Sequence, residues 1–209
     1  MADDEIRDVW AGLATIEDPA CYAPFVKSLL LNATRRTEMS KMNSAELDGD
    51  LWTIPGDRYK TGLDHVIPLS AEALALIGNK PADVKKNAWF IFSTTNGAKP
   101  FSGFSKAKRD LDKAIADIRE REGRPPMENW TLHDLRRTAR TLISRAGVSE
   151  DHAERVVGHV QDDMRDTYNR YDFLKEKRDA LEKLAALVSR ILNLTANVEE
   201  LASRRAVTS

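Results

Sequence analysis

The sequence contains little cysteine, no long hydrophobic run and almost no net charge. Its one cysteine, Cys21, excludes an intrachain disulfide and a cysteine-based metal cluster, which is typical of a reducing compartment. It contains no apolar run of about 18 residues, the length that indicates a membrane span. The start, MADDEIRDVW, is acidic where a signal peptide is basic. We therefore expect an intracellular protein that does not contact a membrane.

The sequence also lacks an excess of either positive or negative charge. The chain has 32 basic and 33 acidic residues, a formal net charge of −1, which argues against binding nucleic acid through bulk charge alone. The charges are nevertheless unevenly distributed, because residues 1–20 are mainly acidic whereas Thr131 to Gly147 holds four arginines and one aspartate. The second segment indicates either a local basic site or an ordinary solvated helix face.

The sequence has no tandem repeat, no low-complexity tract and no linker long enough to require a domain boundary. With 209 residues and 42% hydrophobic content, it is expected to form one domain with a substantial core. Periodicity, caps and helix-ending glycine or proline predict several helices. Their expected ranges are 3–16, 19–31, 71–78, 102–122, 132–146, 149–157 and 173–203.

Two short apolar segments, 51–55 and 65–69, predict a β-hairpin with Lys60 near its turn. The segment WFIF, residues 89–92, predicts a further short strand. The expected fold is therefore mainly α-helical with a small antiparallel sheet. In the last helix, an apolar stripe at three- and four-residue spacing would pack on its own domain or on a neighbour's. The stripe consists of Leu181, Leu184, Val188, Ile191 and Val198.

His133 and Arg136 lie three residues apart at the start of a predicted helix, so their side chains are expected on one face. A guanidinium offers planar, permanently charged donors for two phosphate oxygens, and an imidazole can donate or shuttle a proton near neutral pH. The pair would suit a phosphate. Alone, however, this spacing is common by chance and favours a solvated helix face.

Further residues that could act on a phosphate lie before and after this pair in the sequence. In chain order the set is Arg35 with Glu38, Lys60, His133, Arg136, His159 and Tyr168. It resembles the catalytic domain of tyrosine recombinases, the phage-type integrase family, whose pattern is Arg, Lys, His-x-x-Arg, His or Trp, and a tyrosine nine residues later. The step from His159 to Tyr168 is nine residues. The resemblance covers nearly the whole chain, including LWTIPGDRYKTGLDHVIPLS, TLHDLRRTART and AERVVGH, and points to integrases of prophages and genomic islands.

The resemblance implies how the central groups would act. Arg35 and Arg136 would bind the non-bridging oxygens of the scissile phosphate and stabilise the charge that develops on them. Tyr168 would attack the phosphorus, expel a 5′-hydroxyl and become a 3′-phosphotyrosine. A second 5′-hydroxyl would then displace the tyrosine, so the resemblance implies no cofactor and no metal.

The remaining positions of the set receive supporting roles by the same resemblance. Lys60 would be the general acid for the departing 5′-oxygen, His133 a proton acceptor or shuttle, and His159 a further donor to the phosphate. Glu38 would orient Arg35. The neighbouring arginines of the central helix would contact flanking phosphates or face solvent; these are Arg137 and Arg140.

The resemblance also concerns domains and partners. It implies a single catalytic domain over residues 1–209, without the N-terminal arm-binding and core-binding domains of full-length integrases. The implied substrate is a double-stranded DNA attachment site, bound by a homotetramer that exchanges the helix over about 173–203, with accessory DNA-bending factors. The isolated domain would be a monomer. The implied location is the bacterial cytoplasm, at the nucleoid.

Two departures from the family pattern fall on small residues. The family often has glycine two residues before the first arginine, where this sequence has Ala33, and directly before the glutamate, where it has Thr37. Neither removes a reacting group. Two alternatives stay open: a degenerate or truncated DNA-binding module without cleavage and, less favoured, a type IB topoisomerase. Tyr59 and His65 are expected to be structural, and the spacing disfavours Tyr171 as the nucleophile.

Overall fold

The chain folds into helices with one small sheet. The computed structural model describes residues 1–78, 88–159 and 173–207, with side chains of the last range described as far as residue 193. The helices are α1 (Asp3–Ala14), α2 (Tyr22–Leu31), α3 (Arg36–Ser40), α4 (Ala71–Leu74), α5 (Phe104–Arg121), α6 (Leu132–Arg145), α7 (Glu150–Val157) and α9 (Leu174–Val207). The strands are β1 (Leu47–Asp48), β2 (Leu51–Ile54) and β3 (His65–Pro68), with short 3₁₀ turns η1 (Ser44–Glu46) and η2 (Gly56–Arg58) beside them. The predicted fold class is confirmed.

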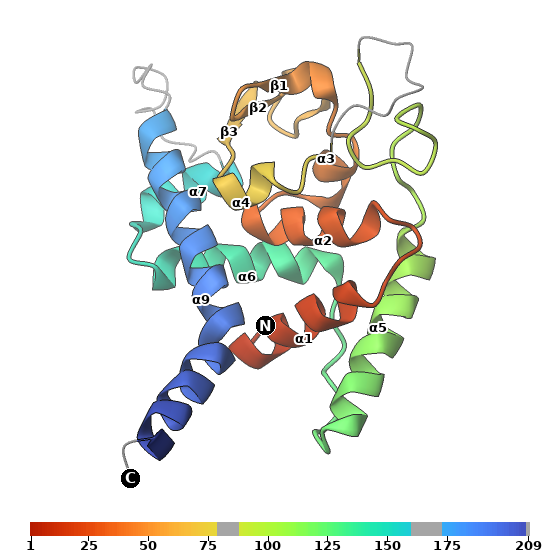
Figure 1. The fold of residues 1–209 in the computed structure, drawn as a ribbon. Coiled ribbons are helices and arrows are strands. Elements are labelled where there is room, and N and C mark those ends of the chain that lie inside the picture. The colour runs from red at the N-terminus through yellow and green to blue at the C-terminus, as the bar shows by residue number, and fades with distance from the viewer. Residues whose placement is uncertain (79–87, 160–172, 208–209) are drawn as a thin grey trace.

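Helix α2 forms the centre of the core because its sequence, YAPFVKSLLL, is apolar around most of its circumference. Phe25, Val26, Leu29 and Leu30 are fully buried, and burying each such side chain stabilises the fold by about 1.5–3 kcal/mol. Helix α6 packs beside α2, while α1 packs against α5 (Figure 1). The burial of α2 places the turn that follows it inside the molecule.

Helix α9 runs along one side of the molecule and contacts α7, α6, α1 and β3 (Figure 1). Leu181, Leu184, Val188 and Ile191 are buried there. This part of the apolar stripe therefore packs on the chain's own domain, whereas the side chain of Val198 lies outside the described residues.

The sheet has the order β1-β2-β3 and is antiparallel throughout. Trp52 pairs with Ile67, and Ile54 pairs with His65. All four are buried, while the alternate residues of β2 are half-exposed. The predicted hairpin is thus present, and the loop between β2 and β3 carries Lys60.

Two sequence predictions of local structure are corrected. The segment 89–92 is not a strand, because its backbone bonds to different segments: Phe90 to Gly97, Ile91 to Met42, and Phe92 to Phe101. Only an isolated bridge between Asn43 and Phe90 results. The helix expected over 71–78 ends at Leu74, and the next residues continue in tighter turns with bonds from Leu76 to Ala73 and from Ile77 to Leu74.

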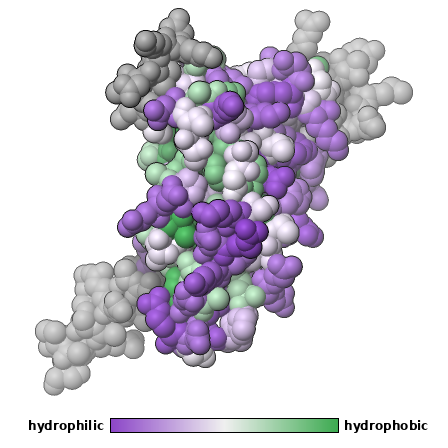
Figure 2. Space-filling model, turned by 90° about the vertical axis from the view of Figure 1, so that its right-hand side faces the viewer, coloured by the Kyte–Doolittle hydropathy of each residue, from purple (hydrophilic) through white to green (hydrophobic). Residues whose placement is uncertain are grey.

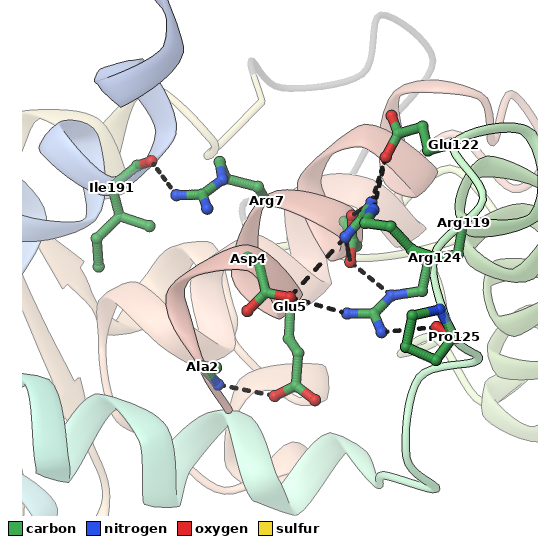
Figure 3. A network of polar contacts seen from close by, with 10 residues as sticks. Ala2, Asp4, Glu5, Arg7, Arg119, Glu122, Arg124, Pro125 and Ile191 are labelled. Atoms are coloured by element: carbon green, nitrogen blue, oxygen red, sulfur yellow. Dashed lines mark hydrogen bonds and ion pairs between the residues drawn. The ribbon is translucent and has the colours of Figure 1, made fainter. Parts of the chain in front are cut away.

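A charge network centred on the buried side chains of Asp8 and Arg119 joins α1 to the end of α5 (Figure 3). Arg119 Nε donates to Asp8 Oδ2 at 2.7 Å, and Arg124 Nη1 donates to the same oxygen at 2.9 Å. Asp4 and Glu122 complete the network through further ion pairs with these arginines. Burial would raise the pKa of Asp8, but its hydrogen bonds with Arg124 and Arg119 outweigh burial and hold the pKa below its usual value.

The face of the molecule that carries α5 is mainly hydrophilic, with hydrophobic residues only in small, separate areas (Figure 2). This agrees with the burial of α5, which turns Ala107, Leu111, Ile115 and Ile118 inwards. Within the described ranges, no helix has the length and apolarity required to cross a membrane.

Candidate active site

Arg35 lies between α2 and α3 and is fixed by Glu38. The backbone N–H of Arg35 donates to Glu38 Oε2 at 2.9 Å, and its Nη1 donates to Glu38 Oε1 at 2.6 Å. Both carboxylate oxygens of this buried glutamate are therefore occupied by one residue. Burial lowers the pKa of Arg35, but the hydrogen bond and charge of Glu38 outweigh burial and raise it. The guanidinium is thus always charged and has a defined direction.

The turn before Arg35 depends on an unusual backbone conformation. Ala33 has φ of 50°, in the left-handed region that favours glycine, and it is fully buried. This is the position where the family often has glycine, so the substitution carries a conformational cost of about 1–2 kcal/mol. Thr37, the other departure, lies within α3, is exposed and carries no such cost. The conformation of Ala33 turns its carbonyl towards α6.

Arg136 of α6 links this turn to the end of α7. It is buried, its Nη1 donates to the Ala33 carbonyl at 2.6 Å, and its Nη2 donates to the Val157 carbonyl. Burial and the neighbouring charge of Arg35 lower the pKa of Arg136. Among the described residues, both bonds go to neutral carbonyls, so dipoles and not a bonded carboxylate solvate this charge.

Tyr59 and His65 form a stacked pair beneath the end of α7. Their ring centroids are 4.7 Å apart with an interplanar angle of 6°. The Tyr59 hydroxyl donates to the Gly158 carbonyl at 3.4 Å, and His65 Nε2 lies 3.3 Å from the Val156 carbonyl. Burial, and then the charge of Lys177, lower the pKa of His65 to about 3, so the ring is neutral and donates this bond.

Three successive carbonyls at the end of α7 are therefore bound by side chains from elsewhere in the chain. His65, Arg136 and Tyr59 bind Val156, Val157 and Gly158 in turn. These are carbonyls that a helix end leaves without partners. Gly158 itself has φ of 61°, and a Cβ there would lie 1.7 Å from the Tyr59 hydroxyl. Three separate elements thus fix the residue that follows, His159.

His159 is exposed and paired with α7. Its Nδ1 lies 2.6 Å from Glu154 Oε2, and the other oxygen of Glu154 accepts from Arg140 Nε at 2.6 Å. The Arg140 side chain is only 22% exposed, whereas that of Arg137 is 75% exposed and lies 3.3 Å from Asp134. The two arginines considered for DNA contact thus differ: Arg140 is engaged within the protein and Arg137 projects into solvent.

Lys60 and His133 are both exposed. Lys60 directly follows the buried Tyr59, whose ring lies 5.7 Å from the Arg35 guanidinium carbon. His133 lies one turn before Arg136 on α6. The proposed nucleophile, Tyr168, and its neighbour Tyr171 fall outside the described residues.

The structure joins the predicted residues through three segments. The α2–α3 turn carries Arg35 with Glu38, α6 carries Arg136, and the end of α7 carries His159. Tyr59 and His65 connect these segments, and sequence reasoning treated both as merely structural. The alternation of buried and exposed residues expected along a strand could have placed His65 on the inner face of the sheet. It could not have predicted the contacts of His65 with Tyr59 and the Val156 carbonyl. In the part of the chain that the structure describes, no group of three histidine, cysteine or carboxylate side chains could hold a metal ion.

Comparison with known proteins gives a consistent result. A model of the phage integrase family matches residues 1–175. Prophage integrase IntA of Escherichia coli (strain K12) is 28% identical over 163 residues, which are 76% of this chain and 37% of that protein. Prophage integrase IntZ of the same organism is 28% identical over 170 residues, which are 80% of this chain and 39% of that protein. The chain thus spans less than half the length of these curated relatives.

The fold is also similar to that of solved recombinases. A lambda integrase dimer bound to a COC′ core site matches with a TM-score of 0.54 and 17% identity, over 78% of this chain and 58% of that chain. At this identity the match establishes a shared fold. It agrees with the helical architecture and small sheet described above.

Proposed function

The chain belongs to the phage integrase family of tyrosine recombinases and matches its catalytic domain, and from this premise we propose that it cuts and rejoins DNA at specific sites. The reaction is transfer of a DNA phosphate to Tyr168 and then to a new 5′-hydroxyl. Integration of a prophage or genomic island is the proposed biological role.

The observation that carries this proposal is the proximity of Arg35 and Arg136, because Arg136 binds the carbonyl of Ala33, two residues before Arg35. Within the described residues, Arg35 pairs with the carboxylate of Glu38 and Arg136 bonds to carbonyls, while the charge of Arg35 lowers the pKa of Arg136. An anion between two such guanidiniums would relieve their repulsion. A phosphate has the geometry for paired donors, and a five-coordinate phosphorus carries more charge than the ground state. The arrangement therefore favours the transition state of phosphoryl transfer.

Each other group has a step in the proposed reaction. The Tyr168 oxygen forms the bond to phosphorus while the bond to the 5′-oxygen breaks, and Lys60 gives that oxygen its proton. His133 accepts or shuttles the proton of the tyrosine, and His159 donates to the phosphate. In the rejoining step, the incoming 5′-hydroxyl attacks the phosphorus and displaces Tyr168. Each step breaks one phosphate ester bond and forms another, so the reaction requires no external energy source.

The proposed partner is double-stranded DNA carrying an attachment site, as in the lambda integrase complex with its core site. Four protomers would act on two sites, with the end of α9 exchanged between neighbours and DNA-bending proteins assisting. The isolated domain would be a monomer, because α9 covers its own core as far as Ile191. Light scattering with and without a site tests this assembly, and a stable tetramer without DNA would contradict it.

A nicked suicide substrate tests the chemistry. The fragment beyond the nick diffuses away after cleavage, so a covalent protein–DNA adduct accumulates. We expect an adduct with the unaltered chain and none with Tyr168→Phe, which should still bind the DNA. Binding without any adduct, on a site that a full-length relative cleaves, would instead support the non-cleaving DNA-binding module. Relaxation of supercoiled DNA that lacks an attachment site would support a topoisomerase.

A further inference from the structure

His159 is tied to Glu154 by both its backbone and its side chain. Its N–H donates to the Glu154 carbonyl at 3.0 Å, and its Nδ1 lies 2.6 Å from Glu154 Oε2. The two residues lie on either side of the left-handed Gly158 that ends α7. The imidazole is therefore folded back over the last turn of α7.

Glu154 is held in turn by Arg140. The second carboxylate oxygen, Oε1, accepts from Arg140 Nε at 2.6 Å, and Arg140 Nη1 donates to Ser144 one turn further along α6. Burial would raise the pKa of Glu154, but the hydrogen bonds with Arg140 and His159 lower it. Glu154 thus remains a carboxylate whose two oxygens bind different donors.

An ionised carboxylate only accepts hydrogen bonds. The imidazole nitrogen that faces Glu154, Nδ1, must therefore carry a proton, and the other ring nitrogen, Nε2, does not take part in this contact. Carboxylate partners set the tautomer and orientation of functional histidines in this way. Loss of such a partner changes which nitrogen carries the proton even when the histidine remains in place.

We propose that Glu154, anchored by Arg140, is a positioning residue that keeps His159 protonated at Nδ1 and presents Nε2 to the scissile phosphate. The proposal rests on the proposed function for the identity of the phosphate. It gives Arg140 a role within the protein in place of contact with flanking DNA phosphates.

The first test measures the tautomer directly. Two-bond ¹⁵N–¹H correlation spectra of the full chain, at a pH where the ring is neutral, report which nitrogen of His159 carries the proton, with His159→Gln used for assignment. In Glu154→Gln the amide has one acceptor oxygen for two donors. Since Arg140 is always a donor, the amide NH₂ should turn to His159. We expect the Nδ1–H signal of the unaltered chain to shift towards Nε2–H, and an unchanged tautomer would overturn the proposal.

The second test measures adduct formation at saturating DNA on the suicide substrate. Glu154→Gln should slow adduct formation by about 10- to 100-fold, the range typical of losing the outer partner of a metal-ligating histidine, with unchanged DNA affinity and thermal midpoint. Glu150→Gln is the matched control, because Glu150 lies on the same helix, 3.7 Å from the same Arg140, and is exposed. We expect no change in that control.

A double-mutant cycle separates positioning from a general structural effect. When His159 is already replaced by alanine, adding Glu154→Gln should cause no further loss. Losses that multiply would overturn the positioning role. Absence of any adduct in the unaltered chain would refute the proposed function itself, while the NMR result would still decide whether Glu154 fixes His159. The two failures are thus distinguishable.

Discussion

Two arginine clusters in this molecule satisfy their donors in different ways. In the network between α1 and α5, Arg119 and Arg124 converge on the buried carboxylate of Asp8, with Asp4 and Glu122 beside them (Figure 3). In the candidate active site, Arg136 donates to two backbone carbonyls and lies near a second guanidinium.

The comparison separates two requirements of a buried arginine: a hydrogen-bond acceptor for each donor, and an acidic group that balances its charge. Both clusters meet the need of a buried donor for a hydrogen-bond acceptor. In the first cluster each arginine has an acidic partner. In the second, among the described residues, Glu38 pairs with Arg35 while the bonds of Arg136 go to carbonyls. An anion beside a partly buried guanidinium without a bonded carboxylate would interact with it more strongly than in water. We therefore interpret the first cluster as structural and the second as a site for phosphate.

The largest expected effect is a loss of stability when the cluster around Asp8 is changed. Asp8→Asn leaves the buried guanidinium of Arg119 and the partly exposed guanidinium of Arg124 facing a neutral group. Removing one partner of a buried pair, such as Arg119 with Asp8, typically costs about 3–5 kcal/mol of the free energy of unfolding. Urea denaturation measures this loss. The control is Asp4→Asn, since Asp4 contacts the same arginines but its side chain is 50% exposed; its cost should stay below about 1 kcal/mol. Equal losses would remove the contrast between buried and exposed partners.

A substitution in the candidate active site should reduce DNA cleavage. Arg136→Ala is expected to reduce adduct formation by about 100- to 1000-fold, or ~2.7–4 kcal/mol, the usual contribution of one donor to a transition state. Arg145→Ala is the control, because Arg145 lies on the same helix but pairs with Asp3 at the surface. It should cleave normally. Normal cleavage by Arg136→Ala would refute the assignment of this arginine.

The link between the loop of Lys60 and the end of α7 can be tested at Gly158. Gly158→Ala places a Cβ 1.7 Å from the Tyr59 hydroxyl and strains a left-handed residue, with an expected cost of about 1–2 kcal/mol for the backbone conformation alone. Adding Tyr59→Phe removes the closest atom and should recover part of the loss, as measured by thermal unfolding and adduct rate. No recovery would mean that backbone strain alone accounts for the effect.

The charge balance of the first cluster also predicts a pH dependence. The pKa of Asp8 is lowered in the folded state, so its ion pairs contribute stability above the unfolded value of about 4. That contribution should be lost as the pH falls through the lower folded value. Denaturation measured from neutral to strongly acid pH should show a shallower acid loss in Asp8→Asn than in the unaltered chain. Identical slopes would contradict the assignment.

The smallest expected effect concerns Ala33, whose carbonyl binds Arg136. Ala33→Gly relieves a conformational cost of about 1–2 kcal/mol but loses a buried methyl worth about 0.8 kcal/mol and adds freedom to the unfolded chain. We expect a net change below about 1 kcal/mol in urea denaturation. Ala33→Val should instead destabilise clearly, since a β-branched residue is disfavoured at φ of 50°. A stable Ala33→Val variant would show that this turn readily adopts another shape.

The amino-acid sequence determined the helical periodicities, the hairpin and the order of the candidate residues. Local patterns suffice for these, because burial repeats every 3.6 residues in a helix and every two in a strand. The apolar WFIF segment misled the strand prediction because periodicity does not reveal which segments receive a backbone's hydrogen bonds.

The tertiary structure decided the partnerships that cross the chain. Arg136 reaches Ala33 and Val157, Asp8 reaches Arg119, and Glu154 holds both Arg140 and His159. Except for the step from Glu154 to His159, these contacts join separate elements, and their existence depends on how the helices pack. The sequence by itself therefore determined which groups we propose for phosphate chemistry. Packing decided which of them are neutralised and which remain charged for an anion, because charge balance depends on distance in space.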